Sequence, residues 1–430
     1  MQIHVVQQGE TIGTIADLYG ISVEKLIQDN ELTNPTMLVV GQSLIVAFPE
    51  LTYTVVEGDT LQRIAEMNDV SVMQLYRNNP FLAEREFLYT GEILVIKYDN
   101  TKGQMAIHGN AYPFINSTIL KKTLPYLTYL SIINYTATTE GEIVSYNDDT
   151  DIIRTAKDYS VMPLMLLTTL TLQGEANIRV TYELLLNEDF QNKQIDNILR
   201  VLKEKGYYGI NIAFQNVNPS TISSYEKYLE KVHSRLSPEG YYIFVTISPG
   251  NSVVDSAIFF EKVNYTTIAQ LSDHIIFMNF EWASNLNAPS PVISMNRMRV
   301  FFDYVTATLP GDNMVVGLST IGYDWQLPYV VGISSVRSLT INNAINLASN
   351  VGAVIRFDEP SQTPYFLYTI RIENNPIQHV VWFIDARSIN SVLDLVVQDQ
   401  MNGTDIWNIM NYDAQLWLVI NTQYEIIKVL

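Results

Sequence analysis

The stretch from Gly206 to Asn218 contains the residues best placed to do chemistry. Its apolar side chains alternate with small or polar ones, the period of two expected of a strand with one face against helices and the other towards a cavity. The apolar residues are Ile210, Ile212 and Phe214, and those between them are Gly209, Asn211, Ala213 and Gln215. Neither a methyl group nor an amide has an acidic proton to give. The cavity face is therefore suited to binding a ligand rather than to acid catalysis.

The residues before this strand predict the element that positions it. Asp189 to Lys205 carries apolar residues at helical spacing with charged residues between them, and Gly206 is suited to end the helix. A helix followed directly by a strand is half of a parallel α/β unit.

The strand resembles the fourth barrel strand of glycoside hydrolase family 18, the chitinase-like hydrolases, and especially its spore cortex-fragment-lytic N-acetylglucosaminidases. That branch reads Gly-Tyr-x-Gly-x-Asn-Ile-Asp-Phe-Glu, so Ala213 stands at the position of an Asp and Gln215 at that of the catalytic Glu. Residues 278–282, Met-Asn-Phe-Glu-Trp, resemble Met-Thr-Tyr-Glu-Trp of the family's sixth strand, with Phe280 at the Tyr position. The resemblance therefore implies three substitutions at the reacting centre.

The resemblance also implies what those substitutions remove. In this family the Glu protonates the leaving oxygen, while the Asp and the Tyr hydroxyl act on the substrate acetamido group that serves as nucleophile. Loss of general acid catalysis alone slows a reaction by about 100-fold to 10,000-fold. We therefore expect a barrel that is largely inactive. A laboratory substitution of Gln215 would not account for Ala213 and Phe280, although whether Gln215 is natural or engineered stays open.

Other residues are expected in the cleft because they resemble family positions. The expected glycan contacts are Asn211, Glu281, Trp282, Tyr323, Asp324, Trp325 and Trp407. An indole has an apolar face for a sugar ring and an N–H for a hydrogen bond, but each Trp has the alternative role of filling the core. A relocated acid would restore some hydrolysis if it lay within hydrogen-bond reach of the glycosidic oxygen. The candidate acids are Glu281, Asp324, Glu359 and Asp405.

The remainder of the chain after a polar linker at 99–103 predicts an α/β fold. Strand-like runs alternate with helical patterns, as in a (β/α)8 TIM barrel over 103–430 with its site at the C-terminal ends of the strands. The runs are 105–109, 127–134, 162–168, 209–214, 241–247, 274–279, 314–318 and 406–410. The last interval is too long for one helix and two loops. Its motifs resemble those of the spore glucosaminidases, which implies a small α+β insertion at about 322–390.

Residues 3–47 and 52–98 repeat one another. The pattern is βααβ, with Thr11 or Thr60 suited to cap the first helix and Ser22 or Ser71 the second. Both copies resemble the LysM module, which implies domains at 1–49 and 50–98 that bind peptidoglycan or chitin. The implied contact residues are Gly9, Glu10, Thr11, Ile12 and Asn30 in the first copy, and Gly58, Asp59, Thr60, Leu61 and Asn79 in the second. The alternative is that these residues serve only turns and caps.

Composition and the N-terminal sequence limit which partners the protein can bind and where in the cell it is expected. The 26 basic and 45 acidic residues give a net charge of −19, which disfavours nucleic acid and anionic membranes as partners. Without Cys, and with five His at no short ligand spacing, we expect no metal and no cofactor. The N-terminus lacks a signal-peptide pattern and no long apolar run predicts a membrane span. With the resemblance, this predicts a protein of the bacterial spore coat or exosporium, made in the mother cell.

Two classes of function follow. The first is a glycan-binding or structural component of the spore envelope, with an inactive barrel and with envelope proteins or further copies of itself as partners. The second is a weak or altered, retaining N-acetylglucosaminidase that acts on peptidoglycan fragments of the spore cortex.

Overall fold

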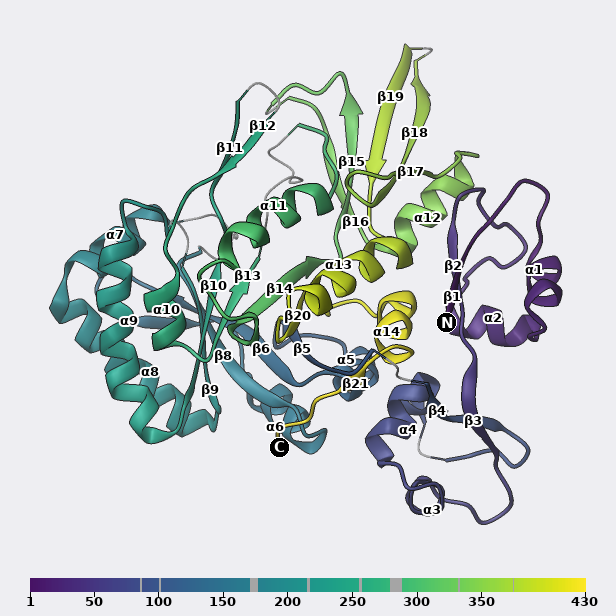
Figure 1. Ribbon diagram of the computed structural model, residues 1–430, viewed down its shortest axis with the longest axis horizontal. Helices are drawn as coiled ribbons and strands as arrows, with labels where there is room; N and C mark the ends of the chain where they lie inside the picture. The colour runs from purple at the N-terminus through teal and green to yellow at the C-terminus, as the bar shows by residue number, and fades with distance from the viewer. Residues whose placement is uncertain are drawn as a thin grey trace.

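The computed structural model describes residues 1–85, 87–99, 102–170, 177–214, 217–254, 257–278, 288–331, 333–373 and 375–430. Two small repeats, repeat 1 (residues 1–49) and repeat 2 (residues 50–98), lie beside a large barrel (Figure 1). A second, separate sheet rises from one end of that barrel. Within the described parts, no helix is both long and apolar enough to cross a membrane. The same residues contain no group of three or more His, Cys, Asp and Glu suited to hold a metal ion.

The barrel is a closed sheet of parallel strands, which confirms the predicted fold. β5 pairs in parallel with β20 on one side and with β6 on the other, so the sheet has no free edge in this ring. The ring strands are β5 (Gln104–Ala111), β6 (Tyr129–Ala137), β8 (Met162–Thr168), β9 (Gly209–Ala213), β10 (Tyr242–Ile247), β13 (His274–Phe277), β14 (Met314–Ser319) and β20 (Gly403–Trp407).

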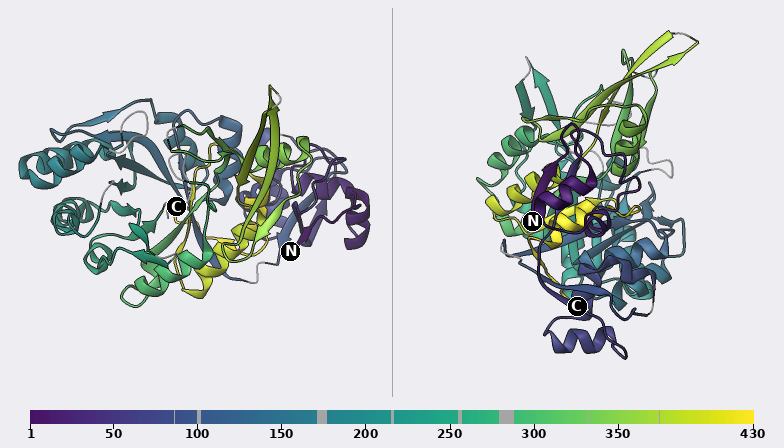
Figure 2. Two further views of the ribbon diagram at one scale, coloured as in Figure 1. Left: turned by 90° about the horizontal axis from the view of Figure 1, so that it is seen from above. Right: turned by 90° about the vertical axis from the view of Figure 1, so that its right-hand side faces the viewer.

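Helices surround this ring (Figure 2). They are α5 (Ser117–Thr123), α6 (Thr150–Asp158), α7 (Ile178–Leu186), α8 (Glu188–Lys205), α9 (Ile222–Leu236), α10 (Thr266–Leu271), α11 (Met295–Val305), α13 (Ala386–Gln398) and α14 (Ala414–Asn421). Short 3-10 turns are η2 (Leu124–Tyr126), η3 (Ser237–Glu239) and η4 (Gly311–Asn313). Additional strands are β7 (Ile143–Ser145), the hairpin β11 (Asn251–Val254) with β12 (Ala257–Phe260), and β21 (Glu425–Ile426).

The last ring strand begins earlier than the run predicted at 406–410. β20 starts at Gly403, where the backbone runs so close to β5 that an added Cβ would lie 1.8 Å from the carbonyl oxygen of Ala106. The polar residues Thr404 and Asp405 hid this strand from a pattern search, because both are buried within the barrel rather than in a turn. The strand ends at Trp407, whose peptide bond to Asn408 is cis.

The interval between β14 and β20 contains an α+β insertion, as predicted. Its antiparallel sheet has the order β16-β15-β19-β18-β17 and stands above one end of the barrel (Figure 1). Its elements are β15 (Gly322–Leu327), β16 (Val336–Leu339), α12 (Ile341–Asn350), β17 (Arg356–Asp358), β18 (Thr363–Ile372) and β19 (Asn375–Trp382).

Each repeat is the predicted βααβ unit with its own apolar cluster. Repeat 1 consists of β1 (Gln2–Val5), α1 (Ile12–Tyr19), α2 (Val23–Asp29) and β2 (Ser43–Val46). Repeat 2 consists of β3 (Pro49–Thr54), α3 (Leu61–Met67), α4 (Val72–Asn78), η1 (Pro80–Glu84) and β4 (Ile93–Tyr98). The predicted helix caps are confirmed, since each cap side chain accepts from a backbone N–H in the first turn. The caps are Thr11, Ser22, Thr60 and Ser71.

Both repeats are docked on the barrel through buried polar contacts. In repeat 1, Nε2 of Gln415 on α14 donates to Oδ1 of Asn30 at 3.1 Å and to the carbonyl oxygen of Ser43 at 2.8 Å. In repeat 2, Nε of Arg77 donates to Oδ1 of Asn421, also on α14, at 2.8 Å. One barrel helix therefore contacts both repeats, and all three units have a defined relative placement.

Candidate functional site

Strand β9 has the two chemically different faces that its alternation predicts. Ile210 and Ile212 are buried in the main apolar cluster together with residues of the surrounding helices. Just past the strand, the ring of Phe214 lies 5.5 Å from that of Tyr228 on α9, with the planes nearly parallel. The apolar face therefore packs under the helices, and the alternate residues face the barrel interior.

The polar face of β9 is held by a hydrogen-bonded layer inside the barrel. Nδ2 of Asn211 donates to Oγ of Ser131 on β6 at 3.1 Å, and its Oδ1 accepts from Oγ1 of Thr246 on β10 at 2.8 Å. All of these partners lie across or beside the strand within the closed ring. Asn211 is 1% exposed, so its amide fixes the interior below the site and does not contact a ligand in this arrangement.

Ala213 is the last residue of β9 and lies on the same face as Asn211, one step nearer to the C-terminal end of the barrel. It is partly exposed, and it pairs in register with Thr168, the last residue of β8. A methyl group therefore occupies this step, where the resemblance implies a carboxylate. Four predicted site residues, Gln215, Phe280, Glu281 and Trp282, lie outside the described residues.

Strand β20 brings a second pair of predicted residues into the interior. Oδ2 of Asp405 accepts from Nδ2 of Asn110 on β5 at 2.7 Å, whereas its Oδ1 is buried without a partner among the described residues. Burial raises the pKa of Asp405 to about 7, against the opposing effect of the Asn110 hydrogen bond. Two residues further on, Trp407 is partly exposed and packs on the apolar layer within the barrel. This indole therefore lies at the C-terminal end of β20, on the interior side of the ring.

The insertion uses Trp325 and Asp324 for its own stability. Trp325 is fully buried, so it fills the core and has no face available to a sugar. Tyr323 packs on it with ring centroids 5.4 Å apart and stays partly exposed. Of the three aromatic or acidic residues predicted here, only Tyr323 remains accessible to a glycan.

Asp324 ties together the strands of the insertion sheet. Its Oδ2 accepts from Nη2 of Arg337 at 2.5 Å and from the hydroxyl of Tyr368 at 2.8 Å. Its Oδ1 lies 2.9 Å from Nδ1 of His379. The side chain of Asp324 is 0% exposed, so the structure does not support the predicted roles of glycan contact or relocated acid. Single-residue patterns miss such networks because their partners come from three other strands.

The remaining candidate acids differ in access. Glu359 is exposed in the turn after β17, where its carboxylate accepts from Nε2 of Gln362 at 3.2 Å. Burial raises the pKa of Asp405 to about 7, but the residue is 1% exposed beneath the end of the barrel.

In the repeats, the matching turn acids Glu10 and Asp59 close the turns in which they lie. Oε2 of Glu10 accepts from the backbone N–H of Gln7 at 2.7 Å, and Oδ2 of Asp59 accepts from that of Val56 at 2.9 Å. These backbone hydrogen bonds lower the pKa of both carboxyl groups. The adjoining glycines, Gly9 and Gly58, both have φ of +86°, which a side chain would strain.

Asn30 and Asn79 occupy matching scaffold positions. Oδ1 of Asn30 accepts from the N–H of Ile45, and Oδ1 of Asn79 accepts from that of Val95, each at 2.8 Å. Their Nδ2 groups donate to carbonyl oxygens of the second helix and of the closing strand. Both amides are buried and bonded within their repeats, so their geometry favours the turn-and-cap alternative. Thr11, Ile12, Thr60 and Leu61 remain at least partly exposed.

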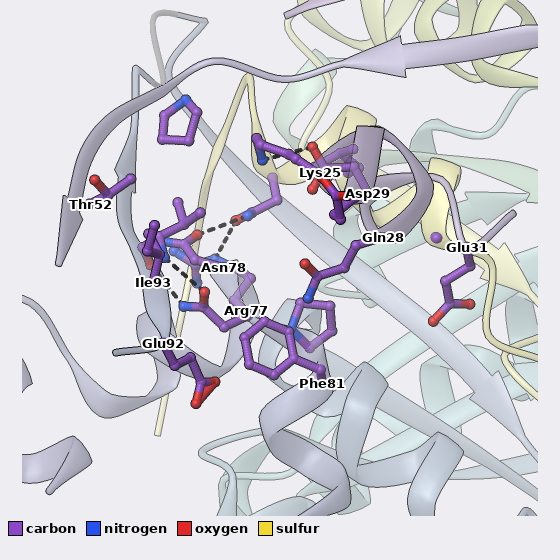
Figure 3. A pocket seen from close by; sticks show the side chains of 18 of the residues that line it. Lys25, Gln28, Asp29, Glu31, Thr52, Arg77, Asn78, Phe81, Glu92 and Ile93 are labelled. Carbon is purple, nitrogen blue, oxygen red and sulfur yellow. Dashed lines mark hydrogen bonds and ion pairs between the residues drawn. The ribbon is translucent and has the colours of Figure 1, made fainter. Parts of the chain in front are cut away.

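Two features of the structure were not predicted from the sequence, namely the polar residues inside the barrel and a cavity between the units. Asn110, Ser131 and Thr246 were not singled out, although a polar residue at an inward position of an apolar strand was an available signal. The other feature is a cavity of about 640 Å³ between the repeats and the barrel (Figure 3). No local pattern predicts that cavity, because its walls come from three separate units.

Comparison with known proteins identifies the families to which the barrel and the repeats are similar. Residues 94–413 match the model of glycosyl hydrolases family 18, and residues 4–47 and 53–97 each match the LysM domain. The chain is 28% identical over 436 residues to the cortical fragment-lytic enzyme of Bacillus anthracis, covering 100% of this chain and 99% of that protein.

Solved structures give the same picture. The spore cortex-lytic enzyme SleL of Bacillus megaterium QM B1551 is 27% identical, with a TM-score of 0.80 over 100% of this chain and 99% of that chain. SleL of Bacillus cereus is 28% identical, with a TM-score of 0.79 over 99% of each chain. These similarities therefore extend over the repeats and the barrel together.

Proposed function

The chain belongs to glycosyl hydrolase family 18 and carries two LysM domains, and from this we propose that it acts on N-acetylglucosamine-containing glycan of the bacterial spore cortex. The proposed activity is that of a slow or altered N-acetylglucosaminidase on peptidoglycan fragments. The observation that carries this proposal is the end-to-end similarity to cortex-lytic enzymes, repeats included. A chain that had lost its glycan ligand would have had no evident need to keep both binding repeats beside the barrel.

The proposal that hydrolysis is slow rests on Ala213. A methyl group at this step of β9 gives no electrostatic support to an acetamido group that attacks the sugar. The Gln at position 215 has no acidic proton for the leaving oxygen. Loss of general acid catalysis slows turnover by about 100-fold to 10,000-fold but leaves the contributions of binding and orientation. Trp407 and Tyr323 are the partly exposed aromatic residues that would hold the sugar.

A second candidate function is glycan binding without turnover, as a structural component of the spore envelope. The same observation at Ala213 favours it, because two of the groups that the reaction needs are absent from positions 213 and 215 of the sequence. Under either function, we propose that the protein resides in the spore coat or exosporium, with envelope proteins or further copies of itself as partners.

Binding is tested by co-sedimentation of the full chain with insoluble spore peptidoglycan. The ligand surface at a LysM groove is uncharged and the protein has a net charge of −19, so retention should change little between about 0.05 and 0.5 M salt. Retention that is lost by moderate salt would indicate nonspecific ionic adsorption. A protein that stays in the supernatant at every salt concentration would contradict glycan recognition.

A further inference from the structure

The cavity between the three units has walls from each of them. Repeat 1 contributes α2 with Lys25 and Asp29, repeat 2 contributes Arg77 and η1, and the barrel contributes the face of α14 that carries Asn421. Figure 3 shows the labelled side chains of both repeats around this space. Its volume of about 640 Å³ lies within the range of about 300–1,000 Å³ usual for small-molecule sites.

Arg77 is a buried cation in the wall of this cavity. Its side chain lies in the last turn of α4, and the residue is 5% exposed. Nε donates to Asn421, and within the described chain no carboxylate forms an ion pair with the guanidinium. Burial lowers the pKa of Arg77 to about 10, so the group remains charged at neutral pH. A buried charge is ordinarily paired.

The less exposed acids that line the cavity already have cations of their own. Asp29 pairs with Lys25 at 2.8 Å. Glu31 pairs with Lys122, and Glu92 pairs with Arg85. Glu24 is exposed at the edge of the cavity. Arg77 is therefore a buried charge without an ion-pair partner among the described residues.

Compensation from within the protein is weak. A helix C-terminus supports a cation by about 0.3–1 kcal/mol when exposed and up to about 2 kcal/mol when partly buried. Glu425 raises the pKa of Arg77 through charge alone, without a direct ion pair. Its effect on that pKa is smaller than the effect of Tyr126. Neither effect replaces a carboxylate at the guanidinium, whose planar fork is suited to bind one with two parallel hydrogen bonds.

We propose that this composite cavity binds a carboxylate of peptidoglycan, with Arg77 as its counter-ion. The site rests on the proposed function, because it assumes that the chain meets peptidoglycan. The aromatic residues Phe81 and Tyr89, which line the cavity, are suited to contact the uncharged part of such a ligand. Arg85 lies over the rings of Tyr89 and Phe81, at 4.7 and 5.3 Å, and keeps these apolar surfaces in place beside the opening. The source of the carboxylate is the end of a stem peptide or the lactyl group of muramic acid.

The ligand series tests the site without altering the protein. Calorimetric titration of the full chain compares the disaccharide GlcNAc-MurNAc bearing a tripeptide, the same molecule with its carboxyl groups amidated, and peptide-free GlcNAc-MurNAc. An N-acetylglucosamine tetramer serves as an uncharged reference. A hydrogen-bonded ion pair is worth about 10-fold to 100-fold in affinity, so amidation should weaken binding by that factor.

Variants connect this preference to Arg77. Arg77→Met removes the charge while keeping the length of the side chain, and Arg77→Lys keeps the charge without the fork. Arg63→Met is the matched control, since Arg63 is an exposed arginine of the same repeat and does not line the cavity. Arg77→Met should abolish the discrimination against the amide, Arg77→Lys should retain part of it, and the control should retain all of it.

The outcomes separate this inference from the function on which it rests. A preference for the tripeptide acid over its amide that depends on Arg77 supports the site and identifies the stem peptide as the source. The lactyl carboxyl is free only in the peptide-free disaccharide, so tighter binding of that compound that depends on Arg77, with equal affinity for the tripeptide acid and amide, identifies the lactyl group. The site is overturned if neither free carboxylate strengthens binding, or if the preference persists in Arg77→Met. If neither the tetramer nor insoluble peptidoglycan binds, the proposed function itself fails. Should Arg77→Met not fold, the wild-type comparison of acid with amide still decides.

Discussion

Asn110 on β5 donates from Nδ2 to Oδ2 of Asp405 on β20 at 2.7 Å, and the other oxygen of this buried carboxyl group has no partner among the described residues. The ring closes where these two strands pair. Because burial raises the pKa of Asp405 to about 7, the folded protein keeps this group protonated at pH values where the unfolded chain, with a pKa of about 3.9, has lost the proton. The stability of the fold is thereby linked to pH.

We predict that Asp405 makes the protein less stable as pH rises from about 4 to 7, because the unfolded state binds fewer protons over that window. Asp405→Asn removes this dependence. Its free energy of unfolding should exceed that of the wild type by on the order of 1–3 kcal/mol at pH 8 and should lose most of that advantage at pH 5. Urea unfolding at both pH values measures this difference. A difference of the same size at both would contradict the assignment.

Asp149 is the control of opposite sign. Burial alone would raise its pKa, but hydrogen bonds from Tyr135, Tyr207 and Lys205 outweigh burial and lower it. Its contribution is present above the unfolded pKa and is lost as pH falls through the folded one. Asp149→Asn should therefore lower the free energy of unfolding at pH 8, by about 3–5 kcal/mol if the buried network is broken.

Restoring the reacting groups should restore turnover cooperatively. Gln215→Glu supplies an acid, but leaves the acetamido group without its electrostatic partner. We predict that Ala213→Asp, Gln215→Glu and Phe280→Tyr together raise turnover of N-acetylglucosamine oligosaccharides by about 100-fold or more, beyond the product of the single effects. Replacing Ala213→Asp by Ala213→Asn in the triple variant keeps the shape without the charge and should lose most of the gain. Strictly multiplicative gains would argue against one reacting unit.

The docking of repeat 1 should depend on Gln415, which donates to Asn30 and to the carbonyl oxygen of Ser43. Gln415→Ala removes the buried donor that joins repeat 1 to α14, although Oδ1 of Asn30 keeps the N–H of Ile45, so the cost should be about 1 kcal/mol. Hydrogen exchange in α2 and β2 should accelerate, while exchange in repeat 2 stays unchanged. The matched control is Gln398→Ala, because Gln398 accepts from Arg299 at the exposed surface. Equal exchange in both variants would mean that other contacts hold repeat 1.

Self-association offers a test of the structural role. At a net charge of −19, copies repel one another at low ionic strength, so association should strengthen with added salt or calcium. Light scattering across both series measures this. A strictly monomeric protein throughout would exclude self-assembly and leave binding to other envelope proteins.

Sequence patterns correctly predicted the features that depend on residues close together in the chain, such as strand faces and helix caps. The alternation in β9 correctly placed Ile210 and Ile212 under the helices, and turn chemistry correctly placed the caps Thr11 and Thr60. Tertiary partners decided the rest. Asp324 was predicted in the cleft, but Arg337 and His379 hold it inside the insertion.

The same limit applies to residues that join the units. Asn30 and Asn79 serve the scaffold of each repeat rather than an open groove, as their buried hydrogen bonds show. Arg77 gave no signal in the sequence, because its isolation depends on the barrel helix α14 and on the ion pairs of repeat 1. Residues at the contacts between units do not recur at the regular spacing of a helix or a strand, so a sequence pattern does not reveal them.

The most direct test of the proposed activity is product analysis. Purified wild-type protein is incubated with spore cortex fragments for an extended time, and released saccharides are identified by mass spectrometry against a heat-denatured sample. We predict slow release of products cleaved after N-acetylglucosamine, in proportion to the amount of protein and about 100-fold to 10,000-fold below the rate of the restored triple variant. Retention on the cortex with no product at any protein concentration would contradict the hydrolase and leave glycan binding as the function.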